Sequence, residues 1–145
     1  MKLAIGCDHG GYALKELVKG YLAEQGYDVI DEGCYSSDRV DYPVYAHKVA
    51  RAVAKKEVDY GICICKSGEG VCMSANKHKG IRAALVYNLE TAGLCREHND
   101  ANVICFGASF TTFDQAIEYI TKFISTEFSG GRHVNRVKLI EETGE

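Results

Sequence analysis

The sequence lacks the features that mark membrane proteins and nucleic-acid-binding proteins. Its 145 residues carry a formal net charge of -3, contain one proline and include no apolar run long enough to span a membrane. A weakly acidic chain without a basic stripe argues against nucleic acid as the main partner. Internal repeats, low-complexity tracts and linkers are also missing, so we expect a single domain over residues 1–145.

A disulfide framework and a zinc site are also not expected. The seven cysteines are odd in number, and the segment after Met1 becomes polar too soon for a signal peptide, which favours reduced thiols and a cytoplasmic protein. Cys63 and Cys65 are only two residues apart, and no C-x-x-C pair or histidine pair completes a tetrahedral set of zinc ligands. Most of these thiols therefore have a simple interpretation as small buried apolar side chains.

Short apolar runs alternate with amphipathic stretches along the whole chain. Strands are expected at 2–6, 27–31, 60–65, 81–87 and 102–106, and helices at 12–25, 43–55, 71–77, 89–97, 113–126 and 132–142. The glycine pair at 130–131 is expected to end the helix that begins at residue 113. The alternation predicts the α/β class, as a three-layer α/β/α domain with a five-stranded parallel sheet.

In an open parallel sheet, ligands bind beyond the carboxyl ends of the strands. We assign three polar loops to that edge. Asp8 and His9 follow the first strand, Cys65 opens the loop to Gly70 after the third, and residues 98–100 (His-Asn-Asp) follow the helix after the fourth. Their coincidence is stronger evidence for a site than any one of the motifs.

The loop after the third strand combines a thiol with a glycine-rich turn. Residues 67–70 read Ser-Gly-Glu-Gly, and such a turn exposes backbone N–H groups that can hold an anion. An ordinary tight turn explains the pattern equally well, and Met73 stands where a dinucleotide-binding motif would need a third glycine. Cys65 beside such a turn can supply a thiolate, although a lone buried cysteine more often serves only in the core.

Two further clusters have both a functional and a structural interpretation. Asp8-His9 can supply a carboxylate and an imidazole, but such a pair often serves only to cap a helix. Arg132 and Arg136 lie four residues apart on one face of a helix, which suits a phosphate, whereas pairing with nearby glutamates would make them an ordinary solvated face. The glycine pair in front of them favours the phosphate.

Read together, these segments resemble the ribose-5-phosphate isomerase type B family, in the larger group that includes the galactose-6-phosphate isomerase subunits. The resemblance runs from Ile5 to about Val137 and covers nearly the whole chain. It is carried by the segments 6–11 (GCDHGG), 41–43 (DYP), 64–70 (ICKSGEG), 75–77 (ANK), 80–83 (GIRA), 96–102 (REHNDAN) and 130–136 (GGRHVNR). The galactose-6-phosphate subunits match parts of this pattern less well.

The resemblance implies a Rossmann-like homodimer, or a dimer of dimers, with active sites at the subunit interface. It also implies isomerisation of a sugar phosphate through an enediolate, without a metal or another cofactor. Cys65 would be the base that moves a proton between C1 and C2, Ser67 and His98 would assist ring opening, and Asp8 would handle hydroxyl protons.

The amides of residues 67–70 would stabilise the enediolate oxygen. The resemblance also implies a set of substrate-binding residues, to which we add Lys66 as a cation specific to this chain. The full set is His9, Tyr42, Lys66, Gly68, Gly70, Asn99, Arg132 and Arg136.

This chain departs from the family pattern at two positions. Lys66 stands where the family usually has a glycine, and Ser109 and Phe110 follow the last strand where the family usually has an arginine. Our hypothesis is that Lys66 replaces part of the missing cation, although an ammonium cannot reproduce a bidentate guanidinium contact. A substrate other than ribose 5-phosphate in length or stereochemistry therefore stays open.

The sequence leaves competing functions. The first is interconversion of ribose 5-phosphate and ribulose 5-phosphate, and the second is isomerisation of a tetrose or hexose phosphate such as allose 6-phosphate. A third is a non-catalytic phosphosugar-binding module, which the presence of Cys65, Ser67 and His98 argues against. A thiol-dependent transferase or phosphatase would need an arginine six residues after Cys65, where Val71 stands.

Overall fold

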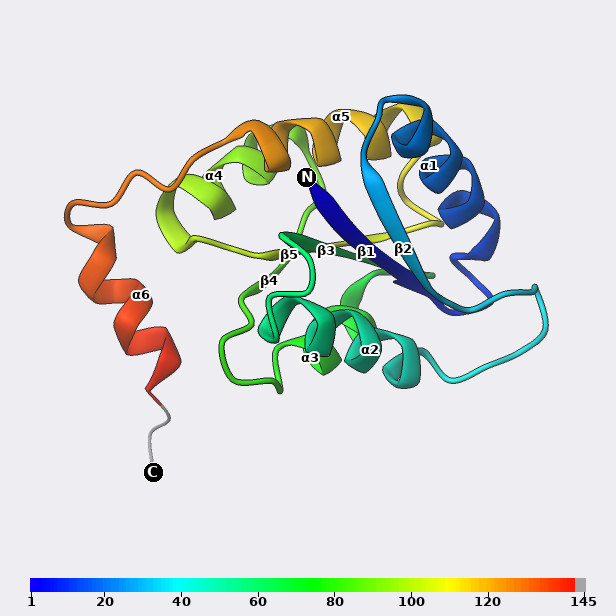
Figure 1. Ribbon diagram of the computed structural model, residues 1–145, viewed down its shortest axis with the longest axis horizontal. Coiled ribbons are helices and arrows are strands. Elements are labelled where there is room, and N and C mark those ends of the chain that lie inside the picture. The colour runs from blue at the N-terminus through cyan, green and yellow to red at the C-terminus, as the bar shows by residue number, and fades with distance from the viewer. Residues whose placement is uncertain (143–145) are drawn as a thin grey trace.

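A computed structural model describes residues 1–142 as a parallel sheet between two layers of helices (Figure 1). The strands are β1 (Lys2–Cys7), β2 (Asp28–Gly33), β3 (Tyr60–Cys65), β4 (Ala83–Leu85) and β5 (Val103–Gly107). The helices are α1 (Tyr12–Glu24), α2 (Tyr42–Ala54), α3 (Glu69–Ala75), α4 (Leu89–Asn99), α5 (Phe113–Ser125) and α6 (His133–Glu141). In this part of the chain the strand order is β2-β1-β3-β5-β4, and every neighbouring pair is parallel. The predicted three-layer α/β/α class is therefore confirmed.

The two faces of the sheet are packed differently. On the side of α1, α4 and α5, large side chains such as Ile64, Phe106 and Phe123 are fully buried. On the side of α2 and α3, the sheet presents small residues such as Cys63 and Cys105. Successive residues of a strand point to opposite faces, so this division follows directly from the apolar runs of β3 and β5.

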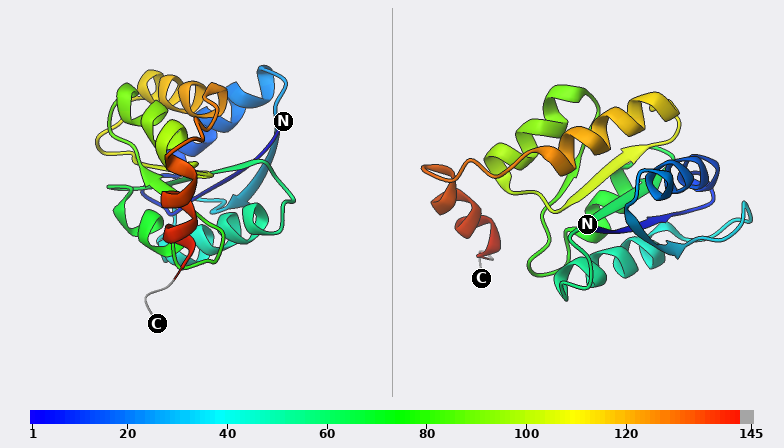
Figure 2. Two further views of the ribbon diagram at one scale, coloured as in Figure 1. Left: turned by 90° about the vertical axis from the view of Figure 1, so that its left-hand side faces the viewer. Right: turned by 45° about the horizontal axis from the view of Figure 1, so that its top comes forward.

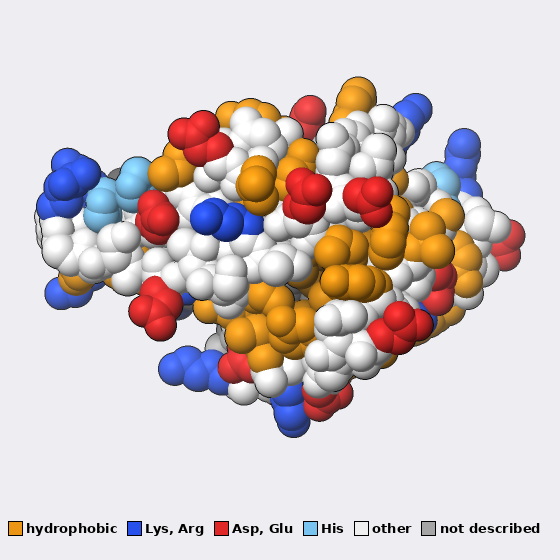
Figure 3. All heavy atoms as spheres, turned by 90° about the horizontal axis from the view of Figure 1, so that it is seen from above, with side chains coloured by type: hydrophobic (Ala, Val, Ile, Leu, Met, Phe, Trp, Pro, Cys, Tyr) orange, Lys and Arg blue, Asp and Glu red, His pale blue; other side chains and the backbone are white. Residues whose placement is uncertain are grey.

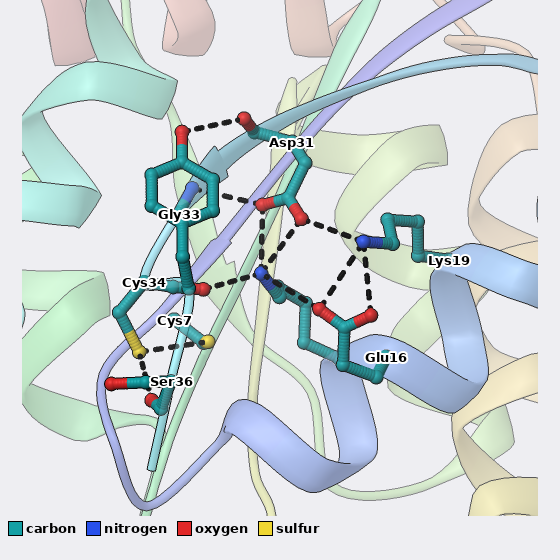
Figure 4. A network of polar contacts seen from close by, with 9 residues as sticks. Cys7, Glu16, Lys19, Asp31, Gly33, Cys34 and Ser36 are labelled. Carbon is teal, nitrogen blue, oxygen red and sulfur yellow. Dashed lines mark hydrogen bonds and ion pairs between the residues drawn. The ribbon is translucent and has the colours of Figure 1, made fainter. Parts of the chain in front are cut away.

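A network of polar contacts around Asp31 joins α1 to β2 at the edge of the sheet (Figure 4). The Lys15 side chain is 0% exposed, and its ammonium donates to both Asp31 carboxylate oxygens at 2.7 and 2.8 Å and to the Cys34 carbonyl at 2.6 Å. Burial favours the neutral form of Asp31, but hydrogen bonds from Lys15 and Lys19 outweigh it and lower the pKa of Asp31. This network fixes the segment that leads from β2 towards the carboxyl edge.

Three expected boundaries differ from the structure. The helix expected at Val71 begins at Glu69, because Gly68 adopts a left-handed φ of 84° and turns the chain directly into α3. The strand expected at 81–87 spans only Ala83–Leu85, since the Arg82 N–H bonds to the Asn102 side chain instead of to a strand. The glycine pair at 130–131 does not end α5, which already stops at Ser125.

Helix α6 stands apart from the two helical layers (Figures 1 and 2). The strand arrows of Figure 1 point away from α6. This helix therefore lies towards the amino edge of the sheet, where the strands begin. His133, at its first turn, is its one buried residue. Within residues 1–142, no helix combines the length and the apolar composition that crossing a membrane would require.

Candidate active site

Cys65 is the last residue of β3 and lies at the carboxyl edge of the sheet. Its side chain is buried, with 5% of the residue exposed, and the backbone N–H of Gly68 donates to its sulfur at 3.2 Å. This contact holds the sulfur against the backbone of the turn that follows β3. The structure therefore places the thiol beside the glycine-rich turn, where the Gly68 N–H bonds to the sulfur and the Glu69 N–H bonds to the Ser67 hydroxyl at 3.3 Å.

Glycine is required at the centre of this turn. Gly68 has a φ of 84°, and a Cβ atom there would lie 2.6 Å from the backbone carbon of Phe106. Gly70, the second residue of α3, has the ring of Tyr42 against the place where its Cβ would stand. The two glycines thus let the turn lie flat on β5 and let Tyr42 close over α3.

The loop after β1 lies directly against the same strand end. A Cβ at Gly11 would be 2.7 Å from the Ile64 carbonyl oxygen, so only glycine permits this approach. Asp8 is 7% exposed, and its carboxylate accepts the N–H of Gly11 at 3.1 Å. Nδ1 of His9 accepts the Val40 N–H at 3.2 Å, which leaves Nε2 of a neutral ring as the protonated nitrogen.

Lys66 lies between two of these loops. Its carbonyl accepts the N–H of Ser109 at 3.1 Å, and its Cβ is 3.5 Å from where a Cβ of Gly10 would be. The side chain is exposed and makes no ion pair with any residue of the described range 1–142. Lys66 therefore brings a positive charge to the carboxyl edge of the sheet, beside Ser109.

These groups border one small cleft of about 350 Å³. Its lining consists of Asp8, Tyr42, Cys65, Lys66, Ser67, Glu69, Gly70 and Met73. Most of these were singled out from the sequence, whereas Met73 was not singled out as a lining residue. The helical spacing of Met73 from Gly70 could have indicated it, because residues three apart share a helix face.

A second polar cluster forms where α4 ends and α6 begins. The rings of His98 and His133 stack with centroids 4.5 Å apart and an interplanar angle of 16°. Burial, together with the charges of His98, Arg132 and Arg136, lowers the pKa of His133. Both arginines are exposed, and Figure 3 shows Lys, Arg and His side chains gathered at the α6 end of the molecule.

The two clusters lie at opposite ends of the sheet, which corrects our expectation for residues 98–100. Helix α4 returns the chain from the carboxyl edge, so Asn99 at its end precedes β5 at the amino edge. Cys65 pairs with Gly107 at the far end of β5. Four residue steps of a strand span about 13 Å, so His98 and Cys65 of one copy do not reach the same sugar.

A larger cleft of about 750 Å³ lies between α6 and the β4 edge, away from Cys65. Its lining includes Asn76, His78, Arg82, Asn99 and Ile140. The lining of this larger cleft shares no residue with the lining of the cleft around Cys65. Among residues 1–142, no three His, Cys, Asp or Glu side chains converge in a way that could hold a metal ion.

The fold and the cleft together define a parallel α/β protein with a buried thiol at the carboxyl edge of its sheet. Residues 3–140 match the family model described as Ribose/Galactose Isomerase, and the chain belongs to this family. The resemblance inferred from the sequence motifs is thereby confirmed.

Individual relatives match over almost their full length. Ribose-5-phosphate isomerase B of Escherichia coli is 45% identical over 139 residues, which cover 96% of this chain and 93% of that protein. The structure of Clostridium thermocellum ribose-5-phosphate isomerase B superposes with a TM-score of 0.96 at 45% identity, covering 97% of this chain and 95% of the other. The Mycoplasma genitalium enzyme with bound ribulose-5-phosphate gives 0.93 at 41% identity, covering 97% and 93%.

Proposed function

We propose that this protein interconverts ribose 5-phosphate and ribulose 5-phosphate, with the Cys65 thiolate as the base. The single observation that carries the proposal is the buried Cys65 sulfur, which accepts the Gly68 N–H at 3.2 Å within the cleft. Relatives at 45% identity named ribose-5-phosphate isomerase B support the substrate. The reaction moves a proton between two carbons and is redox-neutral overall, so the proposed mechanism includes no cofactor.

The thiol cleft supplies groups for each proton that moves. Cys65 takes the proton from C2 of the aldose and returns it to C1, while the oxygen at C1 develops negative charge in the enediolate. The amides of residues 67–70 are proposed to stabilise this oxygen, since donors placed where charge develops lower the barrier. Asp8 would move the hydroxyl proton, and Ser67 would assist the opening of the sugar ring.

The phosphate-side groups are proposed to come from a second copy of the chain. His98, Asn99, Arg132 and Arg136 cluster at the amino edge, about the length of β5 away from the Cys65 of the same copy. A homodimer that docks this cluster over its partner's cleft would complete each site twice by symmetry. Tyr42 would then line the sugar and His9 would join the arginines on the phosphate.

The compartment is a separate part of the proposal. All seven cysteines are free, although Cys7 and Cys34 have sulfurs 3.8 Å apart and Cys63 pairs in register with Cys105. Close thiols that stay unbridged suit a reducing compartment, so we propose that the protein works in the cytoplasm.

A specific observation supports a second candidate substrate. Lys66 borders the cleft beside Ser109, whereas the family pattern has a glycine and an arginine near these positions. Because a shifted cation would favour a differently placed phosphate, a tetrose or hexose phosphate such as allose 6-phosphate remains the alternative.

The test is an aldose–ketose assay with ribose 5-phosphate, erythrose 4-phosphate and allose 6-phosphate. Ribose 5-phosphate is expected to give the highest kcat/KM, and Cys65→Ala should lower kcat by about 10³-fold because general-base catalysis is lost. Cys63→Ala, which changes a thiol two residues earlier in the same strand, is the control and should keep its kcat.

Full activity of Cys65→Ala would rule out the proposed base. Turnover of allose 6-phosphate alone would select the second candidate. Binding of all three sugars without turnover by the unmodified protein would instead identify a phosphosugar-binding module.

A further inference from the structure

Arg82 joins two elements that are far apart in the chain. Its Nε donates to the Asp100 carbonyl at 2.9 Å, and one terminal nitrogen lies 3.3 Å from the Asp100 carboxylate. The other terminal nitrogen lies 2.7 Å from the carboxylate of Glu141 on α6. With its side chain only 17% exposed, the guanidinium links the end of α4 to the end of α6.

Helix α6 has few other attachments to the body of the protein. At its start, His133 stacks on His98. At its end, Glu141 uses both carboxylate oxygens, one on Arg82 and one on the Gly80 N–H at 3.0 Å. Leu139 and Ile140 between these anchors are each 53% exposed, so apolar burial contributes little to holding this end of α6.

The same guanidinium also holds the residue that ends α4. Asp100 adopts a left-handed φ of 49° and receives a second arginine, because Arg96 donates to its other carboxylate oxygen at 2.8 Å. His98 and Asn99 directly precede this fixed residue. Arg82 therefore ties together the two pieces of backbone that carry the phosphate-side cluster.

We propose that Arg82 and Glu141 are positioning residues that dock α6 on the end of α4. Docking preassembles the phosphate-binding arm, which consists of α6 with Arg132 and Arg136. This inference rests on the proposed isomerase function, and it gives the segment 80–83 a role of its own. Arg82 acts on substrate affinity through Arg132 and Arg136, without touching the sugar. When a binding-competent form is only partly populated, the apparent affinity falls in proportion to its population.

The decisive variant is Glu141→Ala, with Glu142→Ala as the matched control. Glu142 is exposed and makes no ion pair with residues 1–142, so both changes remove one carboxylate from neighbouring positions. If Glu141→Ala leaves α6 docked in about a tenth of the molecules, KM for the sugar phosphate rises about tenfold. kcat stays unchanged, since bound substrate restores the docked arm.

Two measurements accompany the kinetics. Amide hydrogen exchange in residues 133–142 should accelerate in Glu141→Ala and stay slow in Glu142→Ala. Arg82→Lys, which keeps the charge but cannot reach Asp100 and Glu141 together, should show an intermediate KM. If Arg82→Lys fails to fold, the two glutamate variants decide the question, because they lie on a peripheral helix.

The proposal is overturned if exchange in α6 is unchanged, or if α6 loosens while KM stays the same. A fall in kcat at unchanged KM would also overturn it. If the unmodified protein isomerises no sugar phosphate, the proposed function fails by itself. Calorimetric binding of inorganic phosphate then decides the positioning role, which predicts about tenfold weaker binding by Glu141→Ala.

Discussion

At the residue scale, Lys66 is one of two positions where the sequence motifs indicate a departure from the family pattern. It follows Cys65 directly and sits between Gly10 and Ser109, which belong to the loops after β1 and β5. A lysine with no ion pair among residues 1–142 is available to an anionic substrate. We expect Lys66 either to bind the substrate or to act on the neighbouring Cys65 thiol, and these two roles have different kinetic signatures.

We expect Lys66→Gly to raise KM for ribose 5-phosphate about tenfold at unchanged kcat, because a charge-assisted contact contributes about 1.5 kcal/mol or more. Lys66→Arg should keep most of the affinity. Lys55→Gly is the control, since Lys55 is an exposed lysine at the end of α2. Steady-state kinetics across pH measures the effect. A Lys66→Gly protein with unchanged KM for every sugar phosphate would refute the binding role, and a displaced pH profile of kcat would indicate action on the thiol.

At the scale of elements, the order of helices and strands was predictable from the sequence, and so was the thiol side of the site. Asp8 directly follows β1 and Cys65 is the last residue of β3, so the rule for carboxyl ends locates both without knowledge of the fold. His98 is different, because α4 carries the chain back across the sheet before this residue. A residue at the end of a crossover helix lies at the amino edge, and the polar pattern alone does not contain that return path.

Buried polar links between elements were not predictable, since sequence spacing does not reveal which partner a lysine finds. Lys15 lies at a helical position that would suit an apolar residue, yet it pairs with Asp31 from the neighbouring β2. The Arg82–Glu141 pair spans 59 residues and is likewise invisible to local patterns. Both links depend on the tertiary fold.

The link between α1 and β2 can be tested with Asp31→Asn. Removing Asp31 leaves the buried Lys15 ammonium with only the Cys34 carbonyl and a longer contact to Glu16 at 3.4 Å, so the free energy of unfolding should fall by about 3 kcal/mol. Asp28→Asn, at an exposed position of the same strand, should change it by less than about 0.5 kcal/mol. Urea denaturation followed by circular dichroism measures both values. Equal effects of the two substitutions would show that the buried pair adds nothing specific.

The same carboxylate gives a pH dependence with a defined sign. Its pKa is lowered in the folded protein from an ordinary value of 3.8. The stability that Asp31 contributes is therefore complete above about pH 4 to 5 and is lost as pH falls through its folded pKa. The difference in unfolding free energy between the unmodified protein and Asp31→Asn should accordingly shrink on acidification below pH 4.

At the scale of the whole molecule, the proposed function needs groups from both polar clusters, which lie far apart. The thiol cleft holds acid–base groups, whereas the exposed arginines lie at the opposite edge of the sheet on α6. A two-fold dimer reconciles these facts only if the arm of each copy serves the cleft of the other. The alternative is a rearrangement of α6 within one copy, and mixed dimers distinguish the two.

Mixing Cys65→Ala with Arg136→Ala copies gives a direct readout of this arrangement. In a mixed dimer the intact cleft of the arginine variant faces the intact arm of the cysteine variant, so one of its two sites is fully wild type. Random reassortment makes about half of the dimers mixed, and about a quarter of wild-type activity should return at low substrate concentration. The control pairs Cys65→Ala with Asp8→Asn, whose lesions fall in the same cleft, and it should recover nothing. If both mixtures stay inactive while mass spectrometry finds mixed dimers, the arm acts within its own copy and the shared site is wrong.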